Sequence, residues 1–130
     1  GEFAALWRPI HLIGLELGFS VAKVLIDNQS TGATRSFKGD AVAVAKKDLI
    51  KGQVLDGEGG KTVWGKLIPA NRSIFINALP IGLASKVKLI NDVKEGHIIS
   101  QKDVMLEKSS NAYILRKEME NDFSNESLVE

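Results

Sequence analysis

The chain has 130 residues, a formal net charge of +1, 25% charged residues and 44% hydrophobic residues, which is typical of a globular domain. Because Lys and Arg are interspersed with Asp and Glu, the chain lacks the concentrated basic face that nucleic acid or an anionic membrane requires. The absence of cysteine excludes disulfides and thiolate metal sites, and no apolar stretch is long enough to span a bilayer. We therefore expect no nucleic-acid, membrane or metal partner.

The first predicted element is a helix over residues 7–27. After Pro9, apolar residues recur at spacings of three and four, as on one helix face: Leu12, Leu15, Phe19, Ala22 and Ile26. Pro9 suits a first helical turn, and residues 28–32 read as the stop. The opening Gly-Glu-Phe resembles a cloning scar, so we expect a piece of a longer protein. Helix and linker together form the predicted first region, residues 4–33.

Residues 38–108 are predicted to form a mainly β domain. The expected strands lie at residues 41–45, 54–55, 62–67, 86–90, 98–99 and 104–106. We expect Trp64 and Phe75 in the core, because large aromatic side chains dominate core packing. The third region, residues 109–130, is predicted to hold a short helix after Asn111 and a disordered tail beyond Glu120.

One stretch of the chain occurs twice. A shift of 44 positions superimposes Asp48 on Asp92 and Gly52 on Gly96, and an apolar pair follows each glycine. Upstream, residues 41–45 align with residues 85–89. Self-similarity at this spacing indicates one supersecondary unit present in two copies. Two copies are too few for a solenoid, so we expect them to pair with each other as a closed two-fold β structure.

A glycine-rich segment follows the first copy and invites comparison with a phosphate-binding loop. The Walker pattern needs a glycine where Leu55 stands, and a helix after Lys61, whereas the residues after Lys61 are strand-like. Nucleotide binding is therefore not predicted. Two interpretations remain: a plain turn that uses glycine for positive φ, or a mobile loop over a partner's active site with Lys61 contacting an anion. The candidate residues are Gly57, Glu58, Gly59, Gly60 and Lys61.

The N-terminal segment from Arg8 to Glu16 combines polar groups with apolar surroundings. On a helix, His11 would project from the first turn, and the guanidinium of Arg8 could hold a carboxylate or phosphate. Alternatively, Arg8 lies on the surface and His11 bonds a backbone group. Three polar residues do not define a catalytic geometry.

The segment from Gly52 to Leu67, with residues 79–84 and the second copy at residues 93–104, resembles the SAF domain of antifreeze-like proteins and sialic acid synthases. That resemblance implies a β-clip fold, here preceded by one helix and followed by a short C-terminal helix. Together with the stretch from Arg8 to Gly18, it resembles the C-terminal part of homoserine-dehydrogenase-like NAD(P)-dependent oxidoreductases. That branch includes the 1-deoxy-D-xylulose 5-phosphate reductoisomerase-like enzymes of isoprenoid biosynthesis.

The resemblance implies a non-catalytic C-terminal domain of a cytoplasmic enzyme, serving subunit association and active-site closure. Arg8 and His11 would border the substrate pocket as catalytic residues, and residues 57–61 would form a lid. NAD(P) would bind a missing N-terminal Rossmann domain, because no Gly-x-Gly-x-x-Gly turn occurs here. No cofactor is expected on this chain itself. Two alternatives remain: a carbohydrate- or peptide-binding module with an exposed Trp64, and a purely structural dimerisation domain.

Overall fold

The computed structural model describes residue 7, residues 9–32 and residues 35–124, and the chain divides into two units between Arg35 and Ser36. The N-terminal unit contains one helix, α1 (Ile13–Asp27), which ends at Asn28 in the left-handed conformation. Asn tolerates this conformation well, and it is common just after a helix. The helix therefore stops where the sequence predicts.

Helix α1 begins later than predicted. Its N-cap is Leu12, which makes no side-chain capping bond, and both Pro9 and His11 precede the helix. The prediction that Pro9 occupies the first turn is therefore wrong. No Ser, Thr, Asp or Asn stands just before Pro9 to cap a helix that begins there, and the ring of His11 instead bonds the Glu16 carboxylate from outside the helix.

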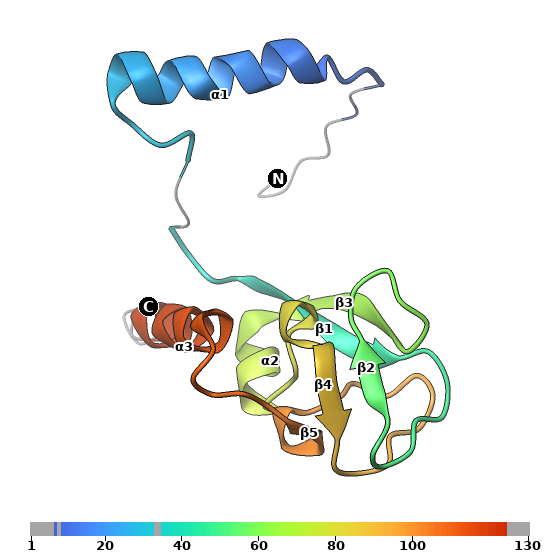
Figure 1. The fold of residues 1–130 in the computed structure, drawn as a ribbon. Coiled ribbons are helices and arrows are strands. Elements are labelled where there is room, and N and C mark those ends of the chain that lie inside the picture. The colour runs from blue at the N-terminus through green and yellow to red at the C-terminus, as the bar shows by residue number, and fades with distance from the viewer. Residues whose placement is uncertain (1–6, 8, 33–34, 125–130) are drawn as a thin grey trace. The chain divides into compact units, whose positions relative to one another are not determined.

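The C-terminal unit contains two small antiparallel sheets and two of the three described α-helices, so the fold is mixed α/β (Figure 1). In the first sheet, β1 (Gly39–Ala45) pairs with β3 (Val63–Pro69). The second sheet has the order β2 (Val54–Asp56), β4 (Ser85–Leu89), β5 (Val104–Met105). Helix α2 (Ala70–Phe75) and the short 3₁₀ turns η1 (Ile81–Leu83) and η2 (Gln101–Asp103) connect the strands.

The two sequence copies pair with each other about an approximate two-fold axis, as predicted. The equivalent residues Leu49 and Val93 exchange both of their backbone hydrogen bonds, at 2.8 and 2.9 Å. The backbone N–H of Gly52 donates to Leu89 at 2.8 Å, and the N–H of Gly96 donates to Ala45, the equivalent of Leu89, at 2.9 Å. We call residues 41–63 copy one and residues 85–104 copy two.

The turns of the two copies are also tied together by carboxylates. The Asp92 side chain accepts from the backbone N–H of Lys51 at 2.7 Å, and the Asp48 side chain accepts from that of Glu95 at 2.9 Å. Each pair is the two-fold equivalent of the other. Both turns need glycine, because Gly52 has φ 90° and Gly96 has φ 75°, a region that other L-residues enter only at a cost.

The buried side chains form a larger cluster that draws on both copies and a smaller one around Val42, Ile68 and Ala78. The largest fully buried side chains come from the strands and their turns: Leu49, Leu55, Leu79, Leu89, Ile99, Val42, Val44 and Val63. Residues 78–80 and 97–99 complete the structure around β1, since Ala43 donates to Leu79 and accepts from Ile99. In the short predicted strand at residues 98–99, Ile98 forms an isolated bridge with Val44 rather than a ladder.

Two predicted core residues lie on the surface. Trp64 is 44% exposed and Phe75 is 89% exposed, so the assignment of both to the core is wrong. In β3 the side chain of Val63 points inward and is fully buried. Because successive side chains of a strand face opposite sides, Trp64 lies on the side of β3 opposite Val63, where it is partly exposed. Phe75 ends helix α2, whose buried side is made by Ala70 and Ser73.

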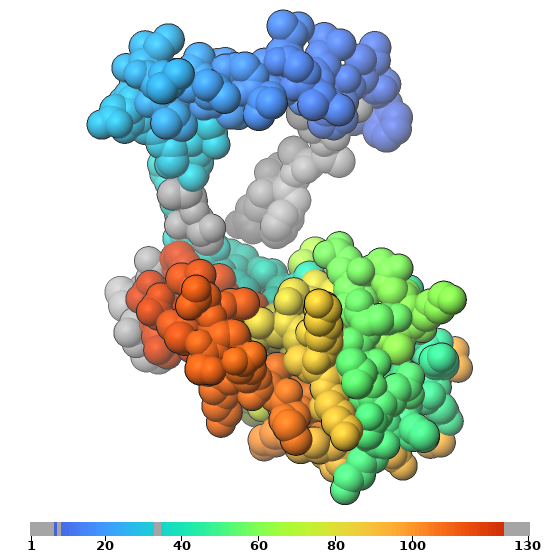
Figure 2. All heavy atoms as spheres, viewed as in Figure 1, coloured from blue at the N-terminus to red at the C-terminus, as the bar shows by residue number. Residues whose placement is uncertain are grey.

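Helix α3 (Asn111–Ser124) is anchored to β1 by a largely buried ion pair. Arg116 donates to both carboxylate oxygens of Asp40, at 2.9 and 2.6 Å, and its guanidinium stacks 4.9 Å from the Phe37 ring centroid. Burial alone would raise the pKa of Asp40, but hydrogen bonds from Arg116 and Ser73 hold it below its usual value. The helix extends past Glu120, beyond the predicted end of order. Figure 2 shows the C-terminal segment beside β4 on one face of this unit.

Candidate functional site

The glycine-rich loop, residues 57–61, folds around the Asp56 side chain. The Asp56 carboxylate accepts from the backbone N–H of Lys61 at 2.6 Å, from that of Thr62 at 3.0 Å, and from the Thr62 hydroxyl. The same hydroxyl accepts from the Asp56 N–H at 3.0 Å. Hydrogen bonds from Thr62 and Lys61 lower the pKa of Asp56 from 3.8 to about 2. This carboxylate therefore takes the anion position that a phosphate would need.

The glycines of the loop are required for two reasons, positive φ and close packing. Gly57 and Gly59 have φ of 77° and 76°. At Gly60, an added Cβ would lie 2.2 Å from the Asp56 carboxyl carbon, so only glycine lets the chain pass this close. The ammonium of Lys46, the residue just after β1, donates to the Gly60 carbonyl at 2.6 Å and so holds the loop in place. The side chains of Glu58 and Lys61 are exposed, and they are the loop's groups that could meet a ligand.

The loop is an extension of copy one relative to copy two. Val63 pairs with Ala45 as Val104 pairs with Leu89, so these residues are equivalent. Between Asp56 and Val63 the chain has residues 57–62, whereas between Ser100 and Val104 it has only the three residues of η2. Ser100 caps η2 much as Asp56 caps the longer loop, by accepting from the Lys102 N–H at 3.3 Å.

The predicted catalytic pair lies in the N-terminal unit. Arg8 falls outside the described residues. His11 is exposed, and its Nδ1 lies 3.0 Å from Glu16 Oε2, so the interpretation of His11 as a backbone-bonded ring is wrong. Residues 57–61 belong to the other unit.

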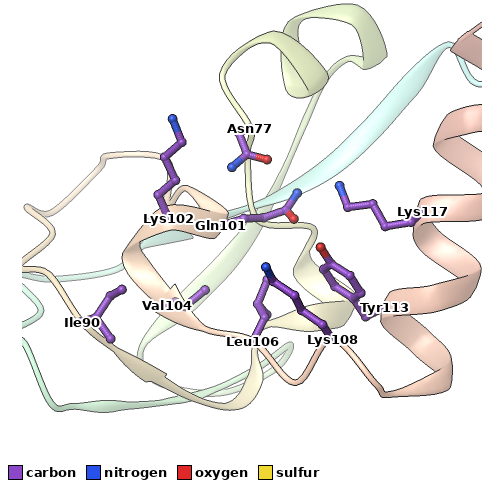
Figure 3. A pocket seen from close by; sticks show the side chains of 9 residues that line it. All are labelled: Asn77, Ile90, Gln101, Lys102, Val104, Leu106, Lys108, Tyr113 and Lys117. Carbon is purple, nitrogen blue, oxygen red and sulfur yellow. The ribbon is translucent and has the colours of Figure 1, made fainter.

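A cavity that sequence reasoning missed lies between α3 and the segment from η2 to β5 (Figure 3). Its volume is about 330 Å³. The apolar part of its lining comes from Ile90, Val104 and Leu106. Asn77 and Gln101 lie across from α3, which contributes Tyr113 and Lys117. The Gln101 amide is oriented by its hydrogen bond to the Ala78 carbonyl at 3.1 Å.

Three lysines line this cavity: Lys102, Lys108 and Lys117. The Lys117 ammonium donates to Glu120 at 2.6 Å and lies 5.7 Å from the Tyr113 ring centroid. These residues are separated by up to 40 positions from Asn77 in the sequence. The lysines were the only sequence signal for this cavity, and lysines are equally common on an ordinary solvated surface.

Helix α1 offers a third candidate, an apolar surface. None of its residues is buried, and five of its large apolar side chains are more than 70% exposed: Ile13, Leu15, Phe19, Leu25 and Ile26. No described helix is long and apolar enough to cross a bilayer. Within the described ranges, no group of three or more His, Asp or Glu side chains could hold a metal ion.

Comparisons with known proteins identify no relative. No protein-family model matches the chain, and no curated protein matches it. The functional argument therefore depends on the geometry above.

Proposed function

We propose that the chain is the C-terminal part of a cytoplasmic NAD(P)-dependent oxidoreductase, with a SAF-like β-clip domain that serves subunit association and active-site closure. The single observation that supports this most strongly is the exposed apolar surface of α1. A helix of this kind is made to be buried in a larger body. The second support is the loop of residues 57–61, which copy one has in place of a three-residue turn.

The polar residues of α1 occupy one narrow stripe. Glu16, Ser20, Lys23 and Asp27 follow spacings of four, three and four, which places them on one side of the helix. Lys23 and Asp27 pair at 2.8 Å, and Glu16 pairs with His11. Roughly two thirds of the circumference is then apolar. An added Cβ at Gly14 or Gly18 would meet no atom within 4 Å, so another backbone could approach α1 there.

We assign this apolar surface to contact with the catalytic domain and with a second subunit. The β domain then follows a polar linker, and its loop carries the exposed Lys61 and Glu58 as groups that can reach a bound substrate. NAD(P) binding belongs to the catalytic domain. In this role Arg8 and His11, which precede α1, would lie near the substrate.

Self-association of the 130-residue chain tests the role of α1. Sedimentation velocity over a range of concentrations should show a monomer–oligomer equilibrium. Phe19→Lys, on the apolar side, should raise the dissociation constant roughly tenfold or more, because it places a charge in the contact surface. Ser20→Lys, one position along but on the polar stripe, is the matched control and should change it little. A strict monomer at all concentrations would count against subunit association through α1.

Active-site closure is tested in the oxidoreductase that carries this chain. Gly60→Ala should displace the Asp56 carboxylate and distort the loop, and turnover should fall while the cofactor dissociation constant stays unchanged. Gly82→Ala, at a glycine with open space, is the control. Equal turnover in both variants would contradict the lid. In addition, titrating the 130-residue chain alone with NADPH should give no saturable signal.

A second candidate is a carbohydrate- or peptide-binding module, which the 44% exposure of Trp64 favours. Exposed aromatic rings offer flat apolar surfaces to sugars and peptides. In a Trp7→Phe background, Trp64 is the remaining tryptophan of the chain. Saturable quenching or enhancement of its emission by an oligosaccharide or peptide, with no oxidoreductase activity in the parent protein, would favour this candidate over the first.

A further inference from the structure

We infer that the cavity between α3 and the η2–β5 segment binds a small phosphomonoester. The inference does not depend on the oxidoreductase proposal, since it concerns a different part of the β unit from the loop of residues 57–61. The charge balance of the cavity is its starting point. Of its three lysines, Lys117 is offset by Glu120 at 2.6 Å, whereas Lys102 and Lys108 form no ion pair within the described residues.

The neighbouring carboxylates are engaged elsewhere. The Asp103 carboxylate accepts from the Asn91 amide at 3.1 Å and from the Ser100 N–H at 3.0 Å. The Glu107 carboxylate accepts from the Ser109 hydroxyl at 3.4 Å. Neither carboxylate forms an ion pair with Lys102 or Lys108 within the described residues, so these two ammonium groups have no fixed counter-charge. A phosphomonoester carries a charge of about −2 at neutral pH, which matches them.

The cationic donors of the cavity are lysines, and no arginine lines it. Arginine would bind either a carboxylate or a phosphate with two parallel bonds. Lysine binds phosphate as a point charge. Figure 3 shows Lys108 and Lys117 reaching toward Gln101, while Lys102 extends outward at the rim. Lys108 is therefore placed to contact the phosphate, with Lys117 beside it although paired with Glu120, and Lys102 adds long-range attraction.

The remaining groups suit a short polyol attached to the phosphate. The Asn77 side-chain amide and the Tyr113 hydroxyl form no hydrogen bond within the described residues and line the same cavity, and both can donate to and accept from hydroxyl groups. Ile90, Val104 and Leu106 supply an apolar wall for the carbon chain. The cavity volume of about 330 Å³ lies at the lower end of the range of roughly 300–1,000 Å³ that is typical of small-molecule sites. This suits a small ligand such as glycerol 3-phosphate.

The test is a titration of the 130-residue chain with glycerol 3-phosphate, followed by NMR of backbone and side-chain amides at neutral pH. We expect saturable shifts that include the side-chain amides of Asn77 and Gln101. The double variant Lys102→Gln and Lys108→Gln should weaken binding by roughly tenfold or more, because it removes both uncompensated charges. Tyr113→Phe should weaken binding of glycerol 3-phosphate but leave that of inorganic phosphate unchanged.

Matched controls separate this site from general attraction to a basic surface. The double variant Lys66→Gln and Lys86→Gln removes the same charge from exposed positions that do not line the cavity and should bind as the unsubstituted chain does. Three results would overturn the inference: no saturable shift at millimolar ligand, equal weakening in both double variants, or succinate or inorganic phosphate binding as tightly as glycerol 3-phosphate. The unfolding midpoint of each variant shows whether it is folded. If a lysine double variant is misfolded, the result for Tyr113→Phe decides the test.

Discussion

Copy one and copy two of the β unit share a turn but differ in what surrounds it. Both have a positive-φ glycine, an aspartate that caps the other copy's turn, and a strand that pairs across the two-fold axis. Copy one contains the glycine-rich loop after Asp56, which copy two lacks. Asp40 immediately precedes copy one, and Ala84 occupies the equivalent position before copy two. Copy two supplies part of the lining of the lysine-lined cavity, namely Ile90, Gln101, Lys102 and Val104. The comparison teaches that the shared parts form the core, whereas the candidate sites lie in the parts that diverged.

The largest expected effect comes from the asymmetric anchor of α3. Arg116→Met should lower the free energy of unfolding by about 3–5 kcal/mol, because it leaves the Asp40 carboxylate largely buried without its partner. Urea unfolding followed by circular dichroism measures the loss.

A double variant sharpens this prediction. Asp40→Asn with Arg116→Met should be less destabilising than Arg116→Met alone, since no unpaired charge then remains buried. If the double variant loses as much unfolding free energy as the two single substitutions lose in sum, the ion pair does not act as described.

The two turn glycines test the symmetry itself. Gly52→Ala and Gly96→Ala should each cost about 1–2 kcal/mol, because alanine is strained at φ of 90° and 75°. The measurement is the urea midpoint of each variant, with Gly82→Ala as the unstrained control. Costs that differ between the two by more than the strain itself would show that the copies are not energetically equivalent.

The two capping aspartates should differ in a smaller way. Asp48 also pairs with the Lys94 ammonium at 2.8 Å, and hydrogen bonds from Lys94 and Glu95 hold the pKa of Asp48 below its usual value. The residue of copy one equivalent to Lys94 is Ile50, so Asp92 has no corresponding ion pair. The destabilisation by Asp48→Asn should therefore shrink more with added salt than that by Asp92→Asn. Melting temperatures at low and high salt measure both, and equal salt sensitivity would contradict the asymmetry.

The smallest effect is a pH dependence confined to copy one. Because the folded-state pKa of Asp56 is lowered from 3.8 to about 2, its contribution to stability is present above pH 4 and is lost as the pH falls toward 2. The difference in urea midpoint between the unsubstituted chain and Asp56→Asn should therefore disappear between these values. The equivalent Ser100→Ala in copy two should show no pH dependence from its own side chain, and a pH-dependent difference there would break the comparison.

The sequence predicted much of the framework because its strongest signals are local. The glycine and aspartate spacing of the two copies, the strands β1 to β5 and the C-terminal helix all follow from patterns within a few residues. The prediction that Trp64 is buried was wrong because the side to which a strand residue points depends on its neighbours, here the buried Val63. An isolated aromatic residue does not reveal which side of the strand is buried.

The candidate sites were harder to predict. The loop at residues 57–61 was visible from its glycines, yet the role of Asp56 in filling its anion position needs the folded geometry. The cavity unites Asn77, η2 and α3, and tertiary packing alone brings these segments together. Neither periodicity nor a motif connects Lys108 with Asn77.

The crosswise pairing of the two copies has a consequence for how the β unit is put together. β2 of copy one is paired with β4 of copy two, and residues 97–99 of copy two are paired with β1 of copy one. Each half keeps one ladder of its own, β1–β3 and β4–β5, but loses these pairings with the other half, so a chain cut between the two copies would yield two incomplete pieces. Mixed together, they should restore one another, which makes this small scaffold a natural candidate for a split-protein sensor of molecular proximity.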